Sequence, residues 1–173
     1  TTAAVADGLG LELPEPLPKV LERAPKPEVR ESPPLSLFAR PGDGDIATRR
    51  IAVLVADGVE GAMLTQLHEA LAQRGAVPRF VGAKLGAVEC ADGETLDVEI
   101  SIDAGPAAVF DAAILPDGED GVKRLALLGQ AVEFVKETYR HCKPLLALGA
   151  SGALLEAAGA FETLPNGEPD PGV

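Results

Sequence analysis

The chain has 173 residues, of which 46% are hydrophobic, but it contains no Trp, one Tyr and five Phe, so its core must be aliphatic. Acidic residues outnumber basic ones by 27 to 15, and the net charge of −12 argues against nucleic acid and anionic membrane surfaces as partners. Two cysteines, no apolar run long enough to span a bilayer and no signal segment predict a cytoplasmic protein.

Residues 1–48 are expected to lie outside the folded domain. The first thirteen resemble the last turns of a helix that stops at Gly8 or Gly10. From Pro14 to Pro41 the chain carries eight of its fifteen prolines, which predicts an extended linker because proline lacks the N–H donor that helices and sheets need. Three apolar side chains of this linker could dock on a neighbouring surface: Leu35, Leu37 and Phe38.

A βαβ unit is expected to open the folded part. Residues 51–56 are all apolar, which is typical of a strand buried on both faces. Apolar side chains then recur at helical spacing from Met63 to Leu71, and the helix should end at Gly75. Residues 77–81 predict a second strand, which a right-handed crossover makes a parallel neighbour of the first.

The remaining elements follow in a regular order. Alternating residues 86–102 around an Asp92-Gly93 turn predict a half-exposed hairpin at the sheet edge. Residues 111–115 predict a buried strand, and the apolar positions from 122 to 139 predict one broken helix or two short ones. Residues 143–155 then predict a strand, a sharp bend and a helix ending at Gly159, whereas the tail after Phe161 should be loose.

These elements predict a doubly wound, mostly parallel, flavodoxin-like α/β sheet over residues 49–162, with helices on both faces, the strand before the bend at its centre and a flexible tail at 163–173. Three loops should meet above its carboxyl edge: 57–61, 116–120 and 149–152. The bend Gly149-Ala150-Ser151-Gly152 is an elbow that exposes one residue beside the N–H groups of the next helix. An anion or a nucleophile can sit there.

The three loops resemble those of the ThiJ/PfpI superfamily, which has the class I glutamine amidotransferase-like fold, over about residues 49–160. In that family a Lys-Pro-hydrophobic-Ala strand leads to a nucleophilic Cys, and the register of that Cys falls here on Gly149. The resemblance implies that Glu60 stands where a Glu hydrogen-bonds the Cys. It also implies that Pro116-Asp117-Gly118 replaces a Pro-Gly-Gly loop that donates N–H groups to an oxyanion.

Because the Cys is absent, the elbow is interpreted as a vestigial pocket with no catalytic residue. Its members share their positions with the family's site: Glu60, Asp117, Gly118, Gly149, Ala150 and Ser151.

A closer resemblance is to the C-terminal end of large-subunit monofunctional haem catalases, and it rests on residues 5–11, 37–42 and 49–58. Those proteins carry a haem core, a helical region, a long linker and a ThiJ/PfpI-like domain without the nucleophile. The resemblance implies that haem and the disproportionation of hydrogen peroxide belong to the parent's core. This chain would then have no activity, cofactor or metal of its own.

The same resemblance implies partners. These are the catalase core and the other subunits of a homotetramer, whose structure and stability the domain would support. Some ThiJ/PfpI relatives also suggest chaperone-like holding of unfolded client proteins, which requires an exposed apolar patch.

An enzyme remains the alternative, namely a hydrolase or glyoxalase-type activity at residues 149–152 with Glu60. A thiol mechanism would need Cys90 in the hairpin or Cys142 at the far end of the elbow strand, and neither is expected to reach Glu60. Ser151 is a second candidate nucleophile, but it is expected to cap a helix. The two histidines that could activate it, His68 and His141, are expected at the surface or at a helix end.

Two further charge clusters have an ordinary and a functional interpretation. Glu60 and Asp117 could pair as acid and base, or bind a cation together with Asp57 and Asp120, although exposed loop carboxylates are common in so acidic a chain. The Arg49-Arg50 pair is expected to mark the start of a strand and not a phosphate site.

Overall fold

The computed structural model describes residues 2–20, 23, 25–26, 28–29, 32–36, 42 and 44–173, in two compact units, Thr1–Asp45 and Ile46–Val173. In the first unit α1 (Thr2–Gly8) ends at the glycine that the sequence predicts. Residues 11–20 form no helix or strand, and the backbone bends at residue 20. Leu35 is 86% exposed, whereas Leu37 and Phe38 lie outside the described residues.

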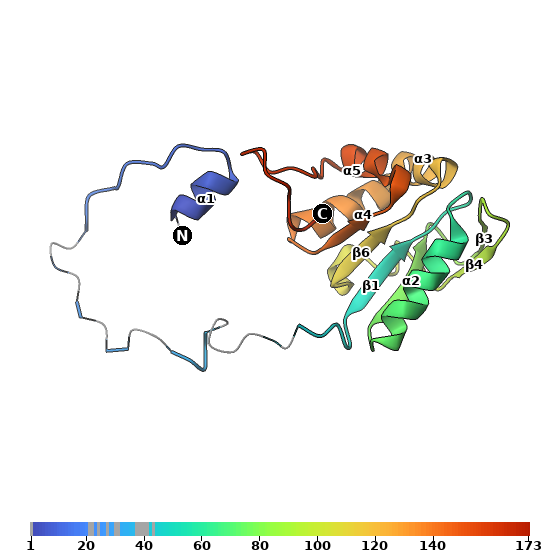
Figure 1. Cartoon of the computed structure of the whole chain (residues 1–173), viewed down its shortest axis with the longest axis horizontal. Coiled ribbons are helices and arrows are strands. Elements are labelled where there is room, and N and C mark those ends of the chain that lie inside the picture. The colour runs from blue at the N-terminus through green and yellow to red at the C-terminus, as the bar shows by residue number, and fades with distance from the viewer. Residues whose placement is uncertain are drawn as a thin grey trace. The chain divides into compact units, whose positions relative to one another are not determined.

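The second unit is built on a five-stranded parallel sheet with the order β5-β2-β1-β6-β7 (Figure 1). Its strands are β1 (Arg50–Leu54), β2 (Val77–Gly82), β5 (Ile100–Ser101), β6 (Ala112–Leu115) and β7 (Leu145–Ala147). The helices are α2 (Gly61–Gln73), α3 (Glu119–Leu127), α4 (Gly129–Arg140) and α5 (Gly152–Ala158). The predicted flavodoxin-like α/β fold and its opening βαβ unit are confirmed.

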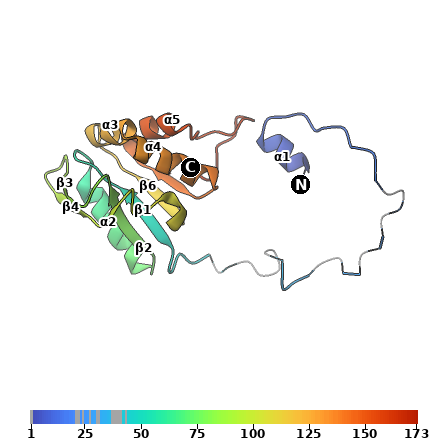
Figure 2. The same cartoon turned by 180° about the vertical axis from the view of Figure 1, so that it is seen from behind.

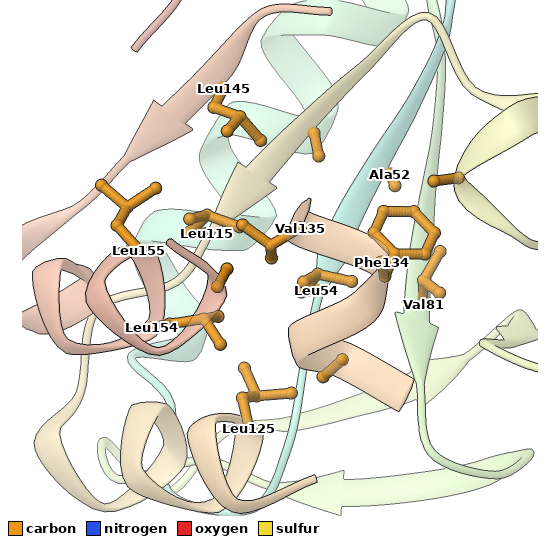
Figure 3. Packing of buried hydrophobic residues seen from close by; sticks show 14 of the residues in the cluster. Ala52, Leu54, Val81, Leu115, Leu125, Phe134, Val135, Leu145, Leu154 and Leu155 are labelled. Atoms are coloured by element: carbon orange, nitrogen blue, oxygen red, sulfur yellow. The ribbon is translucent and has the colours of Figure 1, made fainter. Parts of the chain in front are cut away.

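Helices cover both faces of the sheet. Alternate side chains of β1 point to opposite faces, so each face packs against different helices. Ala52 and Leu54 join a core cluster with residues of α3, α4 and α5, including Phe134 and Leu154 (Figure 3). Ile51 and Val53 join a second cluster with Leu64 of α2. Both clusters are aliphatic apart from a few phenylalanines, as the composition requires.

The strand before the elbow lies at the sheet edge, so its predicted central position is wrong. β1 occupies the centre, and β7 pairs with β6 alone among the strands of the described part. The run of leucines suggested burial on both faces, but Leu145 is 4% exposed whereas Leu146 is 44% exposed. The outer edge of β7 receives one contact from the tail, where the N–H of Leu145 donates to the Gly172 carbonyl at 2.7 Å.

The hairpin is confirmed, but its predicted place in the main sheet is wrong. β3 (Gly86–Glu89) and β4 (Thr95–Val98) pair antiparallel and form a separate two-stranded sheet. At Glu99 the chain turns to the main sheet, because its N–H and one carboxylate oxygen bond the backbone of Phe80. The next two residues then form β5, which is the true edge strand beside β2.

Two short helices, and not one broken helix, follow β6. Leu128 separates α3 from α4 because its backbone is extended, with φ −90° and ψ 107°. No helix in the described ranges combines the length and the apolar character that a membrane span needs.

The tail after Phe161 folds back on the rest of the second unit (Figure 2 shows it from behind). The Asp170 N–H donates to the Glu162 carbonyl at 2.8 Å, and the Tyr139 hydroxyl donates to the Asp170 carboxylate at 3.2 Å. Its predicted flexibility stays a prediction, and these contacts oppose it.

Candidate functional site at the elbow

The first two predicted loops pack backbone against backbone at the carboxyl edge of the sheet. The Glu60 N–H donates to the Asp117 carbonyl at 3.1 Å. A Cβ at Gly118, where φ is +104°, would lie 2.9 Å from Val59 Cα, and one at Gly121 would lie 2.6 Å from the Val59 nitrogen. Only glycine fits both positions, so these glycines bring the loops together.

The third loop joins them through the Asp117 side chain. Its Oδ1 accepts hydrogen bonds from the N–H of Ala150 at 2.8 Å and from the N–H of Gly118 at 2.7 Å. These two bonds, with that of Ala150 the larger cause, lower the pKa of the Asp117 carboxyl from its usual value. One N–H group of the elbow, that of Ala150, therefore already holds an anion, which is the chain's own carboxylate. All three loops meet as predicted.

Gly149 marks the place where a nucleophile would stand, and that space is filled. Its φ is +47°, a conformation that favours glycine. A Cβ built at this residue would overlap the carboxylate of Asp117. A side chain at residue 149 and the present position of Asp117 are therefore mutually exclusive.

Ser151 is buried and does not cap the helix, so its predicted role is wrong. It is 0% exposed, and its Oγ has no hydrogen-bond partner within the described part of the chain. It stands at the N-cap position of α5, but its backbone is already helical, with φ −64° and ψ −11°. Capping residues usually have extended backbones that aim the hydroxyl at the first free N–H groups of the helix.

Neither histidine serves Ser151. His68 of α2 stacks on Phe80 with ring centres 4.7 Å apart, and its Nε2 lies 3.7 Å from Glu99 Oε2. Its side chain is half-buried, which corrects the predicted surface position. His141 ends α4 as predicted, with Nδ1 2.7 Å from the Glu137 carbonyl oxygen. Both rings are therefore engaged elsewhere, and no serine mechanism is assembled.

Cys90 lies beside the first loop, contrary to the prediction that the hairpin keeps it away. A Cβ at Gly61 would be 2.7 Å from its Sγ, and Glu60 is among the carboxylates that act on it. Burial first, and then the negative charge of neighbours led by Asp92, raise the pKa of Cys90 to about 11. The thiol therefore stays protonated and is a poor nucleophile. Cys142 is exposed at the end of α4.

Of the other carboxylates in the three loops, Asp57 is bonded to the backbone. Asp57 Oδ1 accepts a hydrogen bond from the Glu89 N–H at 2.9 Å, which ties the first loop to the hairpin. Within the ranges that the structure describes, no three His, Cys, Asp or Glu side chains are grouped to hold a metal ion. Arg50 begins β1, and its N–H donates to Asp111 Oδ2 at 2.8 Å, which agrees with a strand start.

Sequence reasoning missed the part that Asp117 plays. The signal was present, because this Asp replaces a glycine of the family's Pro-Gly-Gly loop. It also missed Lys143, whose Nζ donates to the carbonyls of Ala107 at 2.8 Å and Phe110 at 2.7 Å and so holds the turn before β6. In this arrangement the Ala150 N–H of the elbow binds the chain's own carboxylate, and Gly149 offers no side chain.

Comparison with known proteins gives consistent matches. The model of the DJ-1/PfpI family matches residues 49–164. The chain is 40% identical to Catalase HPII of Mycobacterium avium over 158 residues, which cover 91% of this chain and 21% of that protein. It is 37% identical to Catalase HPII of Pseudomonas putida over 145 residues, which cover 83% of this chain and 20% of that protein. The chain thus spans about a fifth of the length of these relatives.

Among solved structures, oxidised DJ-1 of Toxoplasma gondii has a TM-score of 0.61 at 21% identity, over 65% of this chain and 62% of that one. At this identity the match shows the fold alone. The resemblance that the loops predicted, to ThiJ/PfpI domains and to large catalases, is confirmed.

Proposed function

This chain belongs to the DJ-1/PfpI family, and we propose that it is the non-catalytic C-terminal domain, with its linker, of a large-subunit haem catalase. One observation carries the non-catalytic part of the proposal. The position of the family nucleophile is Gly149, and the Asp117 carboxylate fills the adjacent space while it takes the N–H of Ala150. The similarity to catalases over most of this chain supports the rest.

The proposed role is structural. Haem and the breakdown of hydrogen peroxide belong to the core of the parent protein, and no residue of this chain is assigned to either. The partners are that core and the other subunits of a homotetramer, in the cytoplasm.

Exposed apolar side chains of the first unit favour this role. Five leucines among the described residues of this unit are more than half exposed: Leu9, Leu11, Leu13, Leu17 and Leu35. Burying such side chains contributes about 25 cal/mol for each Å² of apolar surface removed from water. A linker that packs these leucines on a large partner would therefore stabilise the assembly.

The same exposed side chains favour a second role, chaperone-like holding of unfolded proteins. Three exposed valines add to the apolar surface of the first unit: Val5, Val20 and Val29. A holding protein needs such surface to retain an unfolded client. The test is light scattering from a heat-unfolded enzyme with the full chain and with residues 46–173 alone, and holding requires that only the full chain suppress aggregation.

Enzyme assays test the non-catalytic assignment. Methylglyoxal and an activated ester should be turned over no faster by the wild-type chain than by a Glu60→Ala, Ser151→Ala double variant. A Gly149→Cys, Asp117→Gly variant is the positive arm, because it restores a thiol and removes the blocking carboxylate. Clear turnover by the wild type that the double variant loses would refute the assignment.

The structural role is tested in the parent catalase. Deleting this region should leave peroxide turnover per haem unchanged and lower the temperature at which the tetramer dissociates. A truncated tetramer as heat-stable as the intact one would contradict the proposal.

A further inference from the structure

A cavity of about 250 Å³ lies at the carboxyl edge of β1 and β2, apart from the elbow. Its wall is formed by the residues that follow β1, by the turn that follows β2, by β3 and by the last part of α3. Figures 1 and 2 both show α3 and the hairpin at the same end of the sheet. None of its lining residues belongs to the elbow set of Glu60, Asp117, Gly118 and residues 149–151.

The inner surface of this cavity is apolar. Val55 and Leu125 line it and are almost fully buried, and the half-buried Val88 and Leu128 continue the surface. A cavity at the carboxyl ends of parallel strands is where α/β proteins commonly bind small ligands. An apolar wall alone would accept any small hydrophobic molecule. The charged residues at the mouth of the cavity therefore decide the class of ligand.

Two cations stand at the mouth, and each lacks a partner. Lys84 and Arg124 line the cavity and are exposed, and their side chains make no hydrogen bond or ion pair with any residue that the structure describes. Asp57 is the third charged residue of the lining, and its Oδ1 is engaged by the Glu89 N–H. In a chain of net charge −12, this local excess of positive charge beside an apolar wall favours an anion.

We propose that this cavity binds a small amphipathic carboxylate. The apolar body would lie against Val55 and Leu125, and the carboxylate would lie at Lys84 and Arg124. A guanidinium holds a carboxylate through two parallel hydrogen bonds, which gives Arg124 the larger part in recognition. The volume corresponds to about eight water molecules at roughly 30 Å³ each, so a ligand of about eight non-hydrogen atoms fits.

The test uses three probes of one chain length on the full 173-residue chain: hexanoate, hexanol and hexylammonium. Titration followed by ¹⁵N–¹H NMR gives both affinity and location. Hexanoate should shift the signals of residues 55–57, 83–88 and 124–128. It should bind about tenfold more tightly than hexanol, since a charge-assisted hydrogen bond is worth about that factor. Hexylammonium should bind weakest.

Two variants distinguish a specific effect of Lys84 and Arg124 on hexanoate binding from a general effect of positive charge. A Lys84→Gln, Arg124→Gln double variant should reduce hexanoate affinity to that of hexanol. Lys123→Gln is the matched control, because it removes one positive charge from the same helix at a residue that does not line the cavity. Its affinity for hexanoate should equal that of the wild type.

Three results would overturn the proposal. They are hexanoate shifts outside the cavity, equal affinity for hexanoate and hexylammonium, or an equal loss of affinity in the control and the double variant. Because the cavity is separate from the elbow, each result leaves the proposed non-catalytic role untouched.

Discussion

Replacing Asp117 with Ala should destabilise the folded chain by about 2 kcal/mol. The side chain accepts two backbone hydrogen bonds, from Gly118 and Ala150, and bonds to a charged group contribute roughly 1.5–3 kcal/mol each. The full sum is not expected, because the site is only half-buried and water can reach the freed N–H groups. Removing the Asp117 side chain also removes the hydrogen bond that connects the second loop to Ala150 of the elbow.

Urea unfolding followed by circular dichroism measures this loss. With a slope of about 1–3 kcal/mol per M, the midpoint should fall by about 1 M without a change in slope. Glu156→Gln is the matched control, because it removes an exposed carboxylate from α5 itself and should change stability by less than about 0.5 kcal/mol.

The pH dependence gives a second check on the same carboxylate. The pKa of Asp117 is lower in the folded chain than its reference value of 3.8, so its contribution is present above pH 3.8 and is lost as the pH falls through the folded-state value. The difference between wild type and Asp117→Ala should therefore be full at neutral pH and shrink below pH 3.8. A variant as stable as wild type at neutral pH, or a difference that persists unchanged in acid, would show that the Asp117 carboxylate does not stabilise the fold.

Three further changes test other contacts. Gly149→Ala should cost at least about 2 kcal/mol, because its φ is positive and its Cβ overlaps a carboxylate, and urea unfolding should show a smaller cost when Asp117→Gly is also present. Lys143→Met should cost about 1–3 kcal/mol by the same assay, because three carbonyls lose their donor, whereas Lys136→Met should cost less than about 0.5 kcal/mol. Burial holds the pKa of Cys90 at about 11, so iodoacetamide near pH 7.5 should label one thiol per folded chain by mass spectrometry, and two labels would contradict the structure.

On the proposed non-catalytic role, two residues at the elbow account for the loss of the family's site. A glycine at residue 149 removes the nucleophile, and an aspartate at residue 117 supplies the anion that the N–H groups would otherwise take from a substrate. The second change ties two loops together. The N–H groups of Gly118 and Ala150 thus stabilise this fold.

The elements and their order could be predicted from the sequence. Strand and helix periodicities depend on neighbours in the chain, so β1, α2, β2 and the elbow were predicted close to their observed bounds. The meeting of the three loops also followed from the order of the elements, because loops that end parallel strands gather at one edge of the sheet.

Other neighbours are apparent only in the folded chain. β7 has the sequence of a central strand but lies at the edge, because a run of leucines does not state which neighbour will cover it. Ser151 has the sequence of a helix cap but is buried without a partner, and Cys90 lies against Gly61, 29 positions away. The carboxylate of Asp117 reaches a glycine 32 residues further on. Such contacts depend on how β6 and β7 align in the sheet, and no local pattern records that alignment.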